Sequence, residues 1–136
     1  MKKMKYAEHM VLWTCEARHE HPNCPPENFF FSKGKCDEIL DGGLNNARVW
    51  EEAALKRARI LNLRGVKEVD LYVTGHGAAL ISAIKALRQY EIKVQLYHYD
   101  DTSGDYFRQD PYEAEYYVGI FTKTEDERHA EMRRRG

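Results

Sequence analysis

The sequence lacks any apolar run close to the roughly 20 residues that a membrane-spanning helix needs. Its first residues include lysines but neither a long apolar stretch nor a small-residue cleavage site, so we predict no secretory signal. The net charge is −1, which provides no overall field to attract duplex nucleic acid or an anionic membrane. The three cysteines are an odd number and indicate a reducing compartment, so we expect a cytoplasmic protein. We expect it to bind neither duplex nucleic acid nor a membrane.

Two familiar phosphate-binding motifs are also missing. The pattern Gly-x-Gly-x-x-Gly starts at Gly75 and continues at Gly77, but position 80 is leucine. A Gly-Lys-Ser/Thr triplet, which a P-loop requires, does not occur. Motif matching therefore predicts neither a dinucleotide fingerprint nor a P-loop.

The 136 residues, 43% of them hydrophobic, are enough for one domain with its own core, which we place at 1–136. Apolar residues recur every three or four positions in 44–63, which is typical of a helix with one buried face. Between the first strand and this helix lies a long loop, 17–43, with a short strand at 29–31. Residues 123–136 form a charged tail. In all, we expect strands at 9–16, 69–74, 94–99 and 115–122, and helices at 44–63 and 78–90.

Strands that alternate with helices of this length favour parallel pairing with right-handed crossovers. We therefore predict an α/β fold, a small three-layer Rossmann-like parallel sheet with an added C-terminal β arm. Ligands of such sheets bind outside the carboxyl ends of the strands. That rule predicts that Cys15 and Glu16, the loop 74–77 and residues 98–101 lie along one edge of the sheet.

The sequence Thr74-Gly75-His76-Gly77 lies between an apolar strand and an apolar-faced helix. Glycines allow a sharp turn and close approach of a ligand to the backbone. The first N–H groups of the helix have no intrahelical partner, and the helix dipole favours an anion there. The chemistry suits a phosphate, with a hydroxyl from Thr74 and an imidazole from His76. The alternative is a tight turn with a solvent-facing histidine.

The stretch "VDLYVTGHGAALISAIKALRQYEIKVQLYHYD", 69–100, is about a quarter of the chain. It resembles the CRISPR-associated Rossmann-fold (CARF) family and its small stand-alone relatives. The resemblance implies a homodimer or higher homo-oligomer that binds a cyclic oligonucleotide second messenger in antiviral defence signalling. Some members of that family cleave the messenger as ring nucleases, and others sequester it. The residues that carry over are Thr74, Gly75, His76 and Gly77, as the ligand-facing loop.

Cysteine and histidine recur in "CEARHEHPNC", which contains Cys15, His19, His21 and Cys24. These are good zinc ligands, although their spacing is not a common zinc-finger pattern. Two alternatives remain open: a polar loop with scattered histidines, or a lid in which His19 or His21 folds over the ligand.

Near the third strand, "HYDDTSGDY" contains His98, Asp100 and Asp101. Carboxylates at the end of a strand accept ribose hydroxyls, and a histidine there suits a general base. The alternative is ordinary turn chemistry.

Three functions follow from these patterns. The first is a module that binds an anionic nucleotide at 74–77. The second is a metal-independent phosphodiesterase on the same site, with His76 or His98 as acid–base residue. The third is a small zinc-stapled interaction protein. The first two need no cofactor.

Overall fold

The computed structural model describes residues 6–16 and 21–112. Five strands form one sheet in the order β2-β1-β3-β4-β5, and three helices connect them. The elements are β1 (His9–Cys15), β2 (Phe29–Phe31), α1 (Lys33–Asp41), α2 (Ala47–Leu63), β3 (Glu68–Tyr72), α3 (Gly77–Gln89), β4 (Lys93–Asp100) and β5 (Asp105–Gln109). The first four strands of the sheet pair in parallel, and β5 runs antiparallel to β4.

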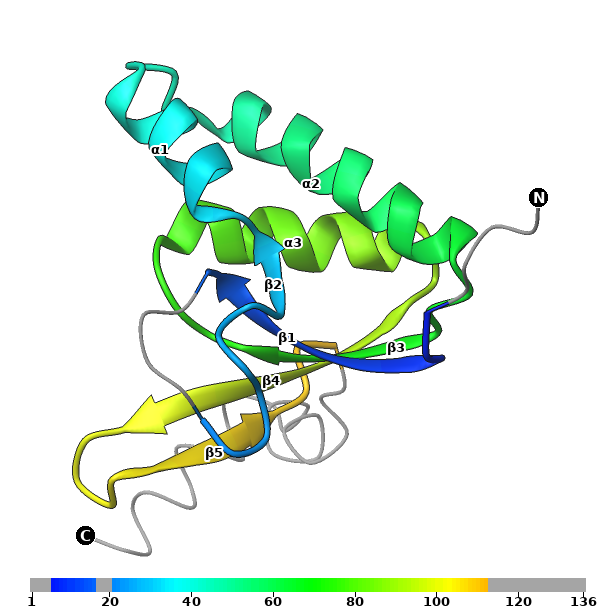
Figure 1. Cartoon of the computed structure of the whole chain (residues 1–136), viewed down its shortest axis with the longest axis vertical. Coiled ribbons are helices and arrows are strands. Elements are labelled where there is room, and N and C mark those ends of the chain that lie inside the picture. Colours follow the sequence, from blue (N-terminus) through cyan, green and yellow to red (C-terminus); the bar gives the residue numbers. More distant parts are fainter. Residues whose placement is uncertain (1–5, 17–20, 113–136) are drawn as a thin grey trace, which may run out of the picture.

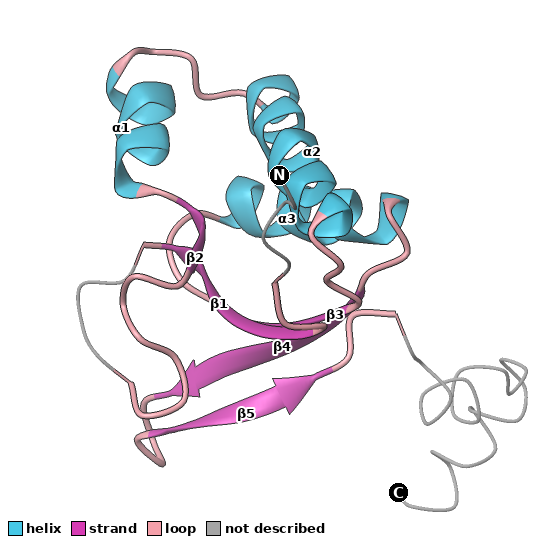
Figure 2. Ribbon diagram, turned by 45° about the vertical axis from the view of Figure 1, so that its right-hand side comes forward, coloured by secondary structure: helices cyan, strands magenta, loops and turns pink. Residues whose placement is uncertain are grey.

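The three helices lie on one side of the sheet (Figures 1 and 2). The segment 21–28 crosses the other side, where Cys24 packs against Trp13 and Tyr72. Right-handed crossovers explain this division, because connections that leave the sheet in opposite directions must cross opposite faces. The chain passes from β1 outward to β2, and then back through α1 and α2 to β3. The predicted α/β, Rossmann-like fold is confirmed, with a loop instead of a helix as the third layer.

The core lies between the helices and the sheet. Strand residues such as Leu71 and Val94 meet a row of small residues on the facing helices. Ala54 and Ala58 of α2 and Ala83 of α3 are fully buried, so the two helices pack closely over the strands. The longest helix begins at Asn46, whose side chain accepts a hydrogen bond from the N–H of Val49 at 3.1 Å.

One element differs from the sequence prediction. Residues 33–41, placed in the long loop 17–43, form the helix α1. Ser32 caps it by accepting a hydrogen bond from the N–H of Lys35, and Cys36 and Ile39 are its buried residues. Its local pattern is weak, and the burial of these two side chains in the main core stabilises it.

The β arm is present as β5. The strand predicted at 115–122 and the tail at 123–136 lie outside the described residues. None of the described helices is both long and apolar enough to cross a membrane.

Candidate functional site

The sheet has a topological switch point between β1 and β3. From β1 the chain leaves towards β2, and from β3 it leaves towards β4, in the opposite direction. In open parallel sheets this divergence opens a crevice at the carboxyl ends of the two strands. Here the crevice is bordered by Cys15 and Glu16 on one side and by 73–77 on the other.

Two threonine hydroxyls join the strand ends at the switch point. Thr74 Oγ1 donates to the carbonyl of Cys15 at 3.1 Å and accepts from the N–H of Cys15 at 3.2 Å. Thr14 Oγ1 donates to the carbonyl of Tyr72 at 3.1 Å. The hydroxyl of Thr74, predicted as a ligand contact, is therefore already used to hold the loop against β1.

The two glycines of the loop have different roles. Gly75 has a φ of +79°, and a Cβ at this position would lie 2.6 Å from Cys15 Sγ. Gly75 therefore lets the loop approach the protein's own cysteine. At Gly77 a Cβ would meet nothing within 4 Å. Only Gly77 borders open space where a ligand can approach.

The positive, N-terminal end of α3 has no side-chain cap. His76 is the N-cap residue, yet its side chain makes no capping hydrogen bond, and the first turn contains no acidic residue. Gly77 and Ala78 are exposed and too small to shield their backbone N–H groups. An anion that reaches this point meets both these donors and the positive end of the dipole.

Beneath the loop lies a pair of thiols, Cys15 and Cys36. A hydrogen bond from the Cys36 thiol, and a weaker contribution from the backbone N–H of His76, lower the pKa of Cys15 despite its burial. The same pairing, together with burial, raises the pKa of Cys36. Glu16 Oε2 accepts from the N–H of Lys33 at 2.7 Å and so fixes the start of α1 beside the pair. Sequence reasoning missed Cys36, because it placed this residue in a loop.

The predicted histidines lie in different surroundings. The His76 ring is exposed, with its centroid 6.2 Å from that of Trp50 on α2. His98 Nε2 lies 2.8 Å from Gln109 Oε1, and its ring stacks on Phe107 with centroids 5.1 Å apart. His98 is thus part of the β4–β5 hairpin.

Asp100 and Asp101 belong to the tip of that hairpin, which extends past the ends of β1 and β3 (Figure 1). Asp100 Oδ1 accepts from the N–H of Thr102 at 3.1 Å. Hydrogen bonds from the Ser103 hydroxyl and then from the Thr102 backbone lower the pKa of Asp100. Among the described residues, no hydrogen bond, ion pair or ring contact joins His98 or these two carboxylates to 74–77. The structure therefore brings Cys15 to the loop, places Glu16 at the start of α1, and keeps the residues of the hairpin away from the loop.

The cysteines and histidines of the predicted zinc set are divided between the two faces of the sheet. Cys15 packs on the helix side, and Cys24 packs on the other side with Trp13. Burial raises the pKa of Cys24 to about 12, which disfavours the thiolate that zinc requires. His21 lies in the aromatic cluster, with its ring centroid 5.0 Å from that of Tyr72. His21 therefore lies on the opposite face of the sheet from α3 and does not cover the start of that helix as a lid would. His19 lies outside the described residues.

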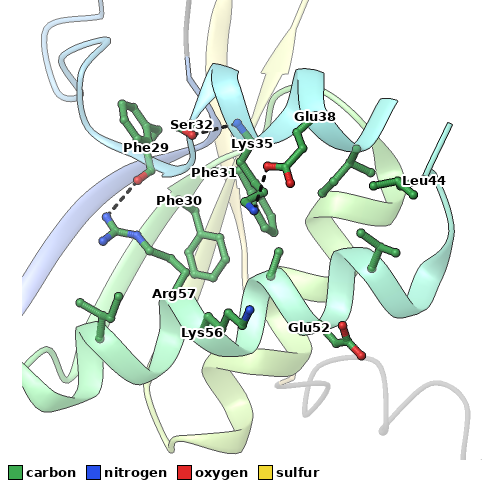
Figure 3. A pocket seen from close by; sticks show the side chains of 14 residues that line it. Phe29, Phe30, Phe31, Ser32, Lys35, Glu38, Leu44, Glu52, Lys56 and Arg57 are labelled. Atoms are coloured by element: carbon green, nitrogen blue, oxygen red, sulfur yellow. Dashed lines mark hydrogen bonds and ion pairs between the residues drawn. The ribbon is translucent and has the colours of Figure 1, made fainter. Parts of the chain in front are cut away.

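A separate pocket of about 380 Å³ opens between β2, α1 and α2 (Figure 3). Its walls are largely apolar, from Phe30 and Ile39 among others, with Lys35, Lys56 and Arg57 at its edge. Arg57 donates to the carbonyl of Phe29 at 3.1 Å and so covers the free edge of the sheet. None of the residues predicted for the nucleotide site lines this pocket.

No family model, curated protein or solved structure matches the chain.

Proposed function

We propose that this chain binds an anionic nucleotide, of the cyclic oligonucleotide second-messenger type, at the start of α3. The observation that carries the proposal is the N-terminus of α3 at the switch point of the sheet, which the side chain of His76 does not cap and where the small residues Gly77 and Ala78 are exposed. Phosphate is the anion that such a helix end accommodates best, since it accepts several N–H bonds at once. The resemblance of 69–100 to the CARF family supports a nucleotide as the molecule to which this phosphate belongs. It also supports a cytoplasmic role in CRISPR-associated antiviral defence.

The proposal includes assembly as a homodimer or higher oligomer. A cyclic oligonucleotide has several phosphates, and a single α3 N-terminus serves one of them. A second copy supplies a second helix end to the same ring, which multiplies the affinity without any new type of contact.

Sequestration is the simpler activity, and cleavage is the second candidate. In cleavage, a ribose 2′-hydroxyl attacks its own phosphate, forming a 2′,3′-cyclic phosphate and releasing the 5′-hydroxyl of the next nucleotide. This reaction needs positioning and charge stabilisation rather than a metal. The exposed ring of His76 favours it, since that side chain is free to reach a bound ring. His98 is committed to Gln109 and is the weaker acid–base candidate.

The test uses a matched pair of variants at position 77. Gly77→Asp places a carboxylate in the first turn of α3, where it stabilises the helix but repels an anionic ligand. Gly77→Ala adds only a Cβ in open space. A thermal-shift panel of cyclic di-, tri-, tetra- and hexanucleotides should raise the Tm of the wild type and of Gly77→Ala. At a hundredfold excess over Kd the rise is about 5–10 °C.

Gly77→Asp should keep the fold and lose the shift. An equal shift in Gly77→Asp would refute the site, and no shift with any nucleotide would refute the ligand class. Chromatography of the nucleotide after incubation then separates holding from cutting. If the ring is cut, His76→Ala should slow cleavage more than it weakens binding; equal losses would mean that His76 only binds.

A further inference from the structure

His9, Glu68 and Asp70 form a compact group at the opposite end of the strands from the α3 site. Parallel pairing sets His9 beside Glu68 and Val11 beside Asp70. Because side chains alternate along a strand, all three polar side chains share the face of the sheet that carries Trp13 and Tyr72, away from the helices. Within residues 6–16 and 21–112, this is the one group of His, Cys, Asp and Glu side chains spaced to hold a metal ion.

The imidazole of His9 lies between two carboxylates. Its Nε2 is 2.9 Å from Asp70 Oδ2, and its Nδ1 is 3.7 Å from Glu68 Oε2. A neutral imidazole has one N–H and one lone pair, while an ionised carboxylate only accepts. The neutral ring can therefore donate to only one of the two carboxylates, and the contact with Asp70 is the one within hydrogen-bonding distance. A metal ion in place of that proton would bind the Nε2 lone pair and the Asp70 carboxylate together.

The surroundings of the group contain charges of both signs and, among the described residues, one acceptor without a partner. Gln95 is in register with Asp70, and its buried Oε1 has no hydrogen-bond partner in the described part of the chain. Lys93 is in register with Glu68, but no ion pair within 4.0 Å joins them there. The Asp70 side chain is only 18% exposed, so its charge is partly desolvated and a nearby cation gains from it.

We propose that this group binds a divalent transition-metal ion through His9 Nε2 and Asp70, with Glu68 placed to accept from Nδ1–H once its Oε2, 3.7 Å from that nitrogen, closes on the ring. Two ligand atoms about 2.1 Å from one ion lie about 3.0 Å apart in an octahedral site and about 3.4 Å apart in a tetrahedral one. The observed 2.9 Å, which also suits a hydrogen bond, is close to the octahedral value, so an octahedral ion fits with little rearrangement. A carboxylate that accepts the other imidazole N–H is the usual partner of a metal-bound histidine. Water fills the remaining positions, and the imidazole favours zinc, cobalt or nickel over magnesium.

The test is a Co²⁺ titration of the full chain, followed by calorimetry and by paramagnetic shifts of the histidine ring resonances. We expect saturable binding that shifts the His9 ring first, and no competition from equimolar Mg²⁺. His9→Ala and Asp70→Asn should each lose at least tenfold in affinity, and Glu68→Gln about tenfold. His98→Ala, which removes a histidine elsewhere on the sheet, should bind as the wild type does.

Absence of a paramagnetic shift at the His9 ring would overturn the proposal and leave a hydrogen bond between His9 and Asp70 as the whole of the contact. Unchanged affinity in His9→Ala would overturn it as well, because the ion would then lie elsewhere. The wild-type ring shifts decide the matter even if a variant does not fold. Neither outcome bears on nucleotide binding at α3, since the two sites share no residue.

Discussion

The loop after β3 and the tip of the β4–β5 hairpin contain similar residues and behave differently. Each has a glycine with positive φ, +79° at Gly75 and +70° at Gly104. The loop is joined to β1 by both bonds of Thr74 and packs directly on Cys15. The hairpin tip is bonded within itself, and a Cβ at Gly104 would meet nothing within 4 Å. Contacts with the rest of the fold, rather than residue type, therefore distinguish the fixed loop after β3 from the ordinary turn at the tip of the hairpin.

The largest expected effect comes from replacing the two glycines. Gly75→Ala combines the strain of a positive φ with a Cβ too close to Cys15 Sγ. We expect it to lower the free energy of unfolding by about 2–4 kcal/mol. Gly104→Ala has the strain alone and should cost about 1 kcal/mol. Urea unfolding followed by circular dichroism measures both values.

The double variant Gly75→Ala with Cys15→Ala is the control for this comparison. Without the sulfur atom, the methyl group introduced at position 75 meets only the Cβ of residue 15, at 3.2 Å, so the added cost of Gly75→Ala in that background should fall towards that of Gly104→Ala but stay above it. If the two single variants lose equal stability, the contact with Cys15 has no energetic weight.

A smaller effect is expected from the hydroxyl groups of the two regions. Thr74→Val leaves the N–H and C=O of Cys15 without their partner, and should cost about 1–3 kcal/mol. Thr74→Ser keeps the hydroxyl and should lose less than about 1 kcal/mol. In the hairpin, Ser103→Ala removes two exposed interactions of the hydroxyl, with the N–H of Asp105 and with the Asp100 carboxylate, and should stay within about 0.5 kcal/mol. A Thr74→Val loss as small as that of Ser103→Ala would mean that water replaces the hydroxyl at the strand ends.

Most of the fold could be predicted from the sequence, because its main elements have strong local patterns. The predicted helix 44–63 corresponds to α2, which starts three residues later, where Asn46 caps it. The predicted strand 94–99 matches β4 to within one residue at each end. The helix α1 could not be predicted, since its few buried residues follow a segment rich in proline and its stability comes from burying Cys36 and Ile39 in the main core.

The site was less predictable, because it depends on strand order. Parallel pairing correctly placed Cys15 beside the loop at Gly75. The same rule placed His98 and Asp100 there too, but β4 continues past the end of β3 to pair with β5. The triad of His9, Glu68 and Asp70 joins residues about 60 positions apart in the sequence, and only the register of β1 on β3 brings them together.

The smallest effect concerns the charge of Asp100 at the hairpin tip. The Ser103 hydroxyl and then the Thr102 N–H lower the pKa of this carboxyl group. Because the folded form then holds its proton less tightly than the unfolded chain, these bonds contribute above the ordinary pKa of aspartate and are lost as the pH falls through the lowered pKa. In Ser103→Ala the pKa of Asp100 should rise towards its ordinary value, as an NMR titration of the carboxyl carbon measures.

The loop after β3 supplies the internal control for that titration. Its bonds at the strand ends join a hydroxyl to backbone groups, so the amides of Cys15 and Gly75 should keep their shifts over the range in which the Thr102 amide moves. If all three amides move together with one midpoint, hairpin and loop respond as a single unit. The division between a locally bonded tip and a loop fixed by tertiary contact would then be wrong, because protonation of one exposed carboxyl group can alter the loop only through contacts that join the two.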